Sequence, residues 1–284
     1  MKKTLLALAT TLCFSQWASA SCPLPNTALA GTTAATSLTL EQHVACLASS
    51  NPSIRDDIAF KTLSTSLRSG ELSTDQVTMV HNLLINDLNK QDKTTHHHSF
   101  VVLSLAEVAR VDRLTPFLSE DKRLKLVKTA IDSLVYVNDY SGFDHDIGYI
   151  HQIAHASDLV LQLALNDAID KASLESLSLA LQKAINPSTL HFYRYGEPDR
   201  LVRATVYLML RESLDLDYWT KWLENAALPP QKTWQDAYSN NKGLAALHNT
   251  QSFFGRLLLW TADSKNPKLK AINEQALLHL KVIR

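Results

Sequence analysis

The chain has 284 residues, with 28 basic and 28 acidic side chains and therefore a formal net charge of zero at neutral pH. A neutral chain lacks the electrostatic attraction that nucleic-acid binding needs, so a nucleic-acid partner is not expected. Glycine occurs only 7 times, and alanine and leucine dominate, which is typical of an all-helical protein.

Residues 1–20 have the pattern of a secretory signal peptide. Lys2 and Lys3 precede a short apolar run, and Ala18-Ser19-Ala20 resembles a cleavage site. The apolar run is too short for a permanent membrane anchor, and no later run is long and apolar enough to be an integral membrane segment. We therefore expect an exported protein, either periplasmic or secreted.

Cys22 and Cys46 remain once residues 1–20 are removed. In an oxidising compartment they are candidates for a disulfide, with two unpaired thiols as the alternative. Lipidation of Cys22 is less favoured, because Ser19 stands where a lipoprotein signal usually carries leucine. Residues 21–37 are rich in Thr, Ala, Pro and Asn, which indicates a flexible N-terminal arm.

Residues 38–284 have apolar side chains at helical spacing and no alternating stretch that indicates a strand. We expect a single all-α domain of about ten antiparallel helices, either a HEAT-like α-solenoid of stacked helix pairs or a closed α/α arrangement. The first five predicted helices are 40–49, 53–68 with Ser53 as its cap, one that begins after the Ser73 cap and includes Gln76, 100–113, and one that begins after Ser119 and ends at Val137. The next three begin after Gly148, at Ser173 (ending at Asn186) and at Pro198. The last three are 216–225, 234–261 with a break near Gly243 or Asn249, and 267–282.

The stretch GFDHDIGYIHQIAHASD, residues 142–158, holds most of the candidate chemistry. On a helix that starts after Gly148, His151, His155 and Asp158 fall within about 60° of one another. Two imidazoles and a carboxylate suit zinc or non-haem iron. His145 or Asp146, in the preceding loop, is a further candidate ligand.

The alternative is a polar stripe or cleft on an otherwise buried helix, with its histidines hydrogen-bonded to neighbours. The pattern His-x-x-x-His-x-x-Asp lacks the glutamate that marks the zinc-protease helix. The consecutive His96, His97 and His98 cannot all face one ion, because neighbouring residues on a helix point in different directions.

The second candidate stretch is HFYRYGEPDRL, residues 191–201, where Pro198 opens a helix and Glu197 lies at its positive end. The stripe of Arg200, Arg203, Tyr207 and Arg211 on this helix faces either an anion, the carboxylates of residues 142–158, or solvent. The last third of the chain carries tryptophans predicted to be core, or alternatively to line a groove, at positions 219, 222, 234 and 260.

The chain resembles the bacterial family of domain of unknown function 2785. The resemblance implies an all-helical, HEAT-like fold and no established activity. His98 and Tyr149 stand where the family usually has arginine and tryptophan, whereas His151, His155, Asp158, Glu197 and Arg200 keep its pattern. The resemblance rests on NPSIRDDIAFKTL (51–63), HSFVVLSLAEV (98–108), PFLSED (116–121), GYIHQIAHASDLV (148–160) and YGEPDRLVRA (195–204).

Two functions are consistent with these residues. The favoured one is a helical-repeat module that binds a protein or small molecule, because solenoids generally bind. Its polar cleft would contain His145, His151, His155, Asp158, Glu197 and Arg200. The alternative is a metal-dependent hydrolase with His151, His155 and Asp158 as ligands, Glu197 as general base and Arg200 as anion stabiliser. The sequence contains neither a Gly-x-Ser-x-Gly elbow nor a glycine-rich phosphate loop.

Overall fold

The computed structural model describes residues 21–28, 37–91, 93–187 and 189–284. Eleven α-helices lie in these ranges, together with one small antiparallel hairpin, so the predicted all-α class is confirmed. The predicted signal peptide, residues 1–20, lies outside the described ranges. Within them, no helix has the length and apolar character needed to cross a bilayer.

The helices correspond closely to the predicted ones. In chain order they are α2 (Leu40–Cys46), the π-helix η1 (Ser53–Phe60), α3 (Lys61–Ser69), α4 (Thr74–Leu88), α5 (Thr95–Leu114), α6 (Glu120–Val135), α7 (Gln152–Ala164), α8 (Lys171–Ile185), α9 (Glu197–Met209), α10 (Leu216–Ala226), the 3-10 helix η2 (Gln235–Ser239), α11 (Asn241–Thr261) and α12 (Pro267–Val282). The hairpin, β1 (Phe143–Asp144) and β2 (Gly148–Tyr149), lies between α6 and α7.

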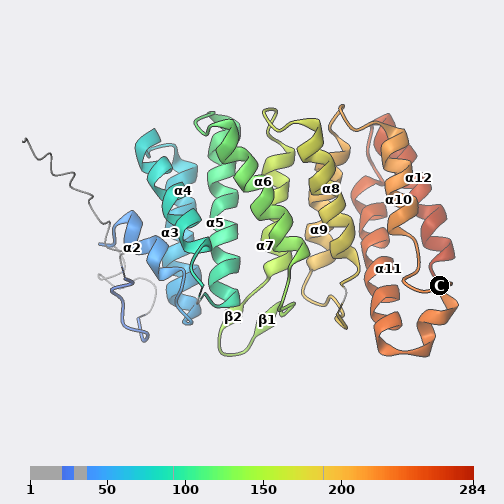
Figure 1. Ribbon diagram of the computed structural model, residues 1–284, viewed down its shortest axis with the longest axis horizontal. Helices are drawn as coiled ribbons and strands as arrows, with labels where there is room; N and C mark the ends of the chain where they lie inside the picture. The colour runs from blue at the N-terminus through green and yellow to red at the C-terminus, as the bar shows by residue number, and fades with distance from the viewer. Residues whose placement is uncertain (1–20, 29–36, 92, 188) are drawn as a thin grey trace, which may run out of the picture.

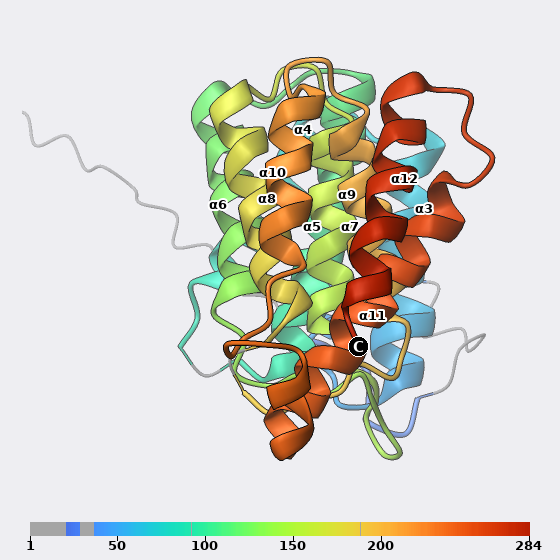
Figure 2. The ribbon, with the colours of Figure 1, turned by 90° about the vertical axis from the view of Figure 1, so that its right-hand side faces the viewer.

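The helices form a two-layer array that runs from α2 at one end to α12 at the other (Figure 1). One layer contains α3, α5, α7, α9 and α11, each of which contacts the next (Figure 2). In the second layer α6 contacts α8 and α8 contacts α10, and the layers meet where α4 packs on α5, α6 on α7 and α8 on α9. The array is open, and it agrees with the expected stacked antiparallel pairs. That these pairs are HEAT-like repeats stays a prediction.

The two ends of the layers differ. Short loops join α5 to α6, α7 to α8 and α9 to α10 at one end, while the longer links that follow α6, α8 and α10 lie at the opposite end with the hairpin (Figure 1). The N-termini of α7, α9 and α11 therefore begin at the hairpin end. Buried tryptophans 219, 222 and 234 belong to the core, as predicted, whereas Trp260 is 40% exposed.

A buried polar network fixes the short-loop end. The Asp112 carboxylate on α5 accepts hydrogen bonds from Arg123 on α6 and from Asn166 in the next loop. Arg211, from the predicted arginine stripe, donates to the carbonyls of Ala164, Asn166 and Ile169. Because charged groups are buried at little net cost only when they are hydrogen-bonded, these contacts hold successive helix pairs together.

The residues predicted to start or end helices are partly confirmed. Gly70, with φ 75°, ends α3, and Ser73 with Gln76 forms the capping box of α4. Ser53 does not cap its helix; instead its own N–H donates to the Asn51 side chain, 2.8 Å away. The helix predicted to start at Ser173 instead starts at Lys171, and Asp170 caps it.

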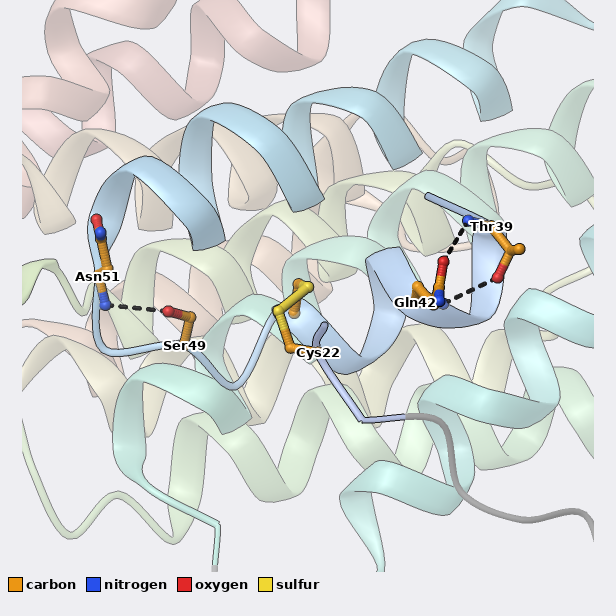
Figure 3. The surroundings of a disulfide bond; sticks show 6 residues. Cys22, Thr39, Gln42, Ser49 and Asn51 are labelled. Atoms are coloured by element: carbon orange, nitrogen blue, oxygen red, sulfur yellow. Dashed lines mark hydrogen bonds between the residues drawn. A yellow bond between two sulfur atoms is a disulfide. The ribbon is translucent and has the colours of Figure 1, made fainter. Parts of the chain in front are cut away.

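The first residues of the predicted arm are fixed by the disulfide between Cys22 and Cys46, whose Cα atoms are 4.6 Å apart (Figure 3). The predicted pairing is thus present. The Asn51 side-chain amide also donates to the Asn26 carbonyl at 2.6 Å. The disulfide and this hydrogen bond attach residues 21–28 to the first helices, and residues 29–36 lie outside the described ranges.

Candidate functional site

The sequence predicted a helix directly after Gly148, and this prediction is wrong. Residues 143–149 form the hairpin, and α7 begins only at Gln152. The Asp144 carboxylate accepts the N–H groups of Asp146 and Ile147 at 2.8 and 2.9 Å and forms the turn of the hairpin. Gly148, at φ 76°, takes a left-handed conformation that glycine adopts without strain. His145 stands on this turn with its side chain 99% exposed, so it does not belong to a cleft.

His151 lies at the N-cap of α7 rather than inside the helix. Its φ of 48° is the only positive value of a non-glycine residue in the described ranges. The left-handed backbone places its ring among aromatic side chains, with centroids 4.8 Å from Tyr149 and 6.5 Å from Tyr195. Burial and then the Arg200 charge lower the pKa of His151, so it is neutral at pH 7, and its Nε2 is buried without a hydrogen-bond partner.

His155 is buried inside α7, and its tautomer follows from its neighbours. The Ser99 hydroxyl donates to the Ile150 carbonyl and lies 2.7 Å from His155 Nδ1. Since a hydroxyl has only one hydrogen, Nδ1–H must donate to Ser99, which leaves Nε2 as an acceptor. Burial, followed by the effect of His151, lowers the pKa of His155 to about 3.

Asp158 forms an ion pair with Arg200 of α9. Burial raises the pKa of Asp158, and Arg200 opposes that effect. Nowhere in the described ranges do three His, Cys, Asp or Glu side chains gather closely enough to hold a metal ion. The predicted metal half-site of His151, His155 and Asp158 is therefore not seen in the described ranges. The two imidazole rings are neighbours, with centroids 6.0 Å apart, but His155 Nδ1 is hydrogen-bonded to Ser99 and Asp158 is paired with Arg200.

Glu197, the predicted general base, starts α9 and is only 2% exposed. One carboxylate oxygen accepts the N–H of Tyr195 at 2.8 Å, and the other is buried without a hydrogen-bond partner. A Cβ at Gly142 would collide with the Tyr195 ring, so the base of the hairpin packs closely against this loop. Glu197 thus fixes the backbone of the loop that precedes α9. It does not line the cavity that contains His155, Asp158 and Arg200.

His155, Asp158 and Arg200 meet at a cavity of about 270 Å³ on the layer formed by α3, α5, α7 and α9. Two charged residues of its lining, Arg68 of α3 and Glu107 of α5, were not predicted as site residues. They form a two-point ion pair in which Arg68 Nε lies 2.7 Å from a Glu107 oxygen. The remaining lining residues are Phe60, Leu103, Ala106, Leu161, Gln162 and Arg203.

Arg203 gives the cavity its excess charge. It has no ion pair or hydrogen bond within the part of the chain that the structure describes. The cavity therefore contains three guanidinium groups, two carboxylates and one neutral histidine acceptor. Such a lining favours a compact anion, because guanidinium groups bind carboxylate, phosphate and sulfate oxygens in two-point geometry.

Arg55 is the most important residue that the sequence analysis missed. It is completely buried, and its Nη2 donates to the carbonyls of Ile147 at 2.7 Å and Tyr149 at 3.3 Å. Its guanidinium carbon also lies 4.5 Å from the centroid of the Phe100 ring. The available signal was an arginine beside Ile54 on the apolar side of a predicted helix.

The three consecutive histidines have three different partners. His96 contacts the Thr94 hydroxyl, His97 contacts Asp87, and His98 lies 3.2 Å from the Ser133 hydroxyl. This divergence agrees with the expectation that they cannot face one ion. Burial lowers the pKa of His98 to about 4.

The low pKa of His155 predicts a loss of stability in acid. In the unfolded chain a histidine takes up its proton near pH 6.5, whereas native His155 resists protonation down to about pH 3. The free energy of unfolding should be highest above pH 6.5 and fall by about 1.4 kcal/mol per pH unit for this group as the pH decreases. Urea unfolding at several pH values should show a shallower decrease in His155→Gln. His145→Gln should keep the wild-type profile; an unchanged profile in His155→Gln would refute the assignment.

Comparison with known proteins assigns the chain to a family without assigning an activity. A search of curated proteins and a search of solved structures both return no match. The model of the family described as "Protein of unknown function (DUF2785)" matches residues 84–259. This match covers most of the chain, including α5, α7 and α9, and agrees with the resemblance seen in the sequence. The chain therefore belongs to the DUF2785 family.

Proposed function

We propose that the protein is a binding module that takes up a compact anionic ligand in the cavity between α3, α5, α7 and α9. The observation that carries the proposal is the excess positive charge of this lining. Arg203 faces the same cavity as two arginine–carboxylate pairs and forms no ion pair or hydrogen bond in the described ranges, although its charge also acts on Asp158 and opposes the rise in the pKa of that carboxyl.

The two ion pairs prepare the cavity for a ligand. Glu107 holds Arg68, and Asp158 holds Arg200, so neither guanidinium must be ordered when the ligand binds. A receptor whose groups are already fixed loses less conformational entropy on binding. Arg203 then supplies the unpaired positive charge.

His155 adds a requirement for the ligand. Its Nδ1–H is committed to Ser99, and its ring lines the cavity as a neutral acceptor. A ligand with a hydroxyl or N–H donor beside its anionic group would satisfy both Arg203 and His155. The cavity volume of about 270 Å³ is near the lower end of small-molecule sites, which favours a ligand of few atoms.

The metal-dependent hydrolase receives no support from this geometry. His151 and His155 are neighbours, but His155 Nδ1 is hydrogen-bonded to Ser99, Asp158 pairs with Arg200, and Glu197 does not line the cavity. The binding function therefore remains the better account of these residues.

We also propose that the protein acts outside the cytoplasm. The pattern of residues 1–20 supports export, and a disulfide such as Cys22–Cys46 persists mainly in oxidising compartments. The Cys22 sulfur is engaged in that bond, so a lipid thioether cannot occupy it at the same time.

The binding proposal predicts that Arg203→Gln weakens the binding of compact anions. Titration calorimetry with phosphate, sulfate and citrate should show at least one that binds, with an affinity about tenfold or more lower in the variant, since a charge-assisted hydrogen bond is lost. Arg110→Gln is the matched control, because it removes the same charge from α5 outside the cavity lining and should change affinity by less than about twofold. Equal losses in both variants, or no binding by the wild type, would refute the proposal.

The export proposal predicts the mass and redox sensitivity of the mature chain. Expressed in full in a bacterial host, the protein should appear in the periplasm or medium as a chain starting at Ser21, two hydrogens lighter than its reduced form. Reduction should lower the free energy of unfolding by about 2–4 kcal/mol. Retention of residues 1–20 in the cytoplasm, or a lipid on Cys22, would contradict the proposal.

A further inference from the structure

A second, larger hollow of about 780 Å³ lies between the start of α9 and α11. It is separated from the arginine-lined cavity by α9 itself, since Asp199 lines this hollow and Arg200 lines the other. We propose that this hollow binds an amphipathic carboxylate, with the aliphatic chain on its apolar floor and the carboxylate at Arg256 and Arg194. This inference does not depend on the function proposed for the first cavity.

The floor of the hollow is apolar. Pro198 contributes from α9, and Leu258 and Leu259 contribute from α11. Leu259 is 68% exposed, so it presents apolar surface to water beside the hollow. An aliphatic chain lying here would remove this surface from water.

The rim of the hollow carries an excess of positive charge. Arg194 and Arg256 both line it, and neither forms an ion pair in the described ranges. Arg194 contacts the Tyr195 ring, 5.8 Å from its centroid. The one carboxylate in the lining, Asp199, already accepts the Trp260 indole N–H at 3.0 Å. The charge complement of this rim is therefore an anion rather than a cation.

Gly255 keeps the hollow open. It lies inside α11, has no positive φ, and an added Cβ would meet no atom within 4 Å. Glycine in a helix interior is unfavourable relative to alanine or leucine, and no turn or close backbone contact requires it at this position. Its effect in the structure is to leave space where a side chain would project into the hollow.

The test uses three probes that separate charge from chain. Decanoate has both an aliphatic chain and a carboxylate, decyltrimethylammonium has a similar chain with a positive charge, and citrate has negative charge without a chain. Titration calorimetry below the micelle concentration is done on Arg203→Gln, in which citrate binding to the first cavity is weakened, and decanoate should bind at least tenfold more tightly than either of the others.

Two variants locate the binding. Arg256→Gln should weaken decanoate at least fivefold and reduce its advantage over the cation. Gly255→Leu should abolish binding without lowering the Tm, because leucine is the better helix former and the space is open. An unchanged Tm in Gly255→Leu shows that binding is lost because leucine fills the hollow, and not because the protein unfolds.

Arg203→Gln separates the two sites, because it alters the first cavity and should leave decanoate affinity unchanged. The inference is overturned if the cation binds as tightly as decanoate. It is also overturned if Gly255→Leu and Arg256→Gln both keep wild-type affinity, or if Arg203→Gln causes the same loss as Arg256→Gln.

Discussion

The arrangement of the hairpin end depends on the buried guanidinium of Arg55. A buried charge is tolerated only when it is paired and its donors are satisfied. The Asp56 carboxylate, 2.7 Å from Nε, is the counter-ion of Arg55, while Nη2 donates to two hairpin carbonyls and the guanidinium lies over the face of Phe100. The π-helix η1 is thereby joined to β2, whose chain continues directly into α7. Because the Ile150 carbonyl accepts from Ser99, and Ser99 accepts from His155, the same contact sets the position and tautomer of the cavity histidine.

The rest of the cavity is built across neighbouring helices of one layer. The Arg68–Glu107 pair joins α3 to α5, and the Arg200–Asp158 pair joins α9 to α7. At the opposite end, the networks around Asp112 and Arg211 fix the short loops of the same helices. The layer of α3, α5, α7 and α9 is thus fixed at both ends. Arg203 lies beside two arginine–carboxylate pairs whose side chains are already ordered.

The fold could be predicted from the sequence to the extent that its signals are local. Helical periodicity and caps such as Ser73 with Gln76 determine most helix bounds. Of the three alternatives for the arginine stripe, contact with the carboxylates of residues 142–158 holds for Arg200, which pairs with Asp158. The short hairpin before α7 gives little periodic signal, and without it His151 was placed on the helix instead of at its left-handed cap. Arg55 and Glu107 are charged residues in ordinary helical patterns, and their contacts with the hairpin and with Arg68 arise only when segments distant in the sequence meet.

The most direct test is hydrogen exchange of the Ile150 amide, which donates to the Gly142 carbonyl at 3.0 Å, in Arg55→Met. Methionine leaves an apolar side chain in place of the charge, and Asp56, whose side chain is 26% exposed, keeps access to water. The helices should therefore persist while the hairpin loses its anchor. The account predicts that the Ile150 amide loses most of its protection, whereas amides in α12 keep theirs. Wild-type protection of Ile150 in this variant would contradict the claim that Arg55 positions the hairpin and the histidine that follows it.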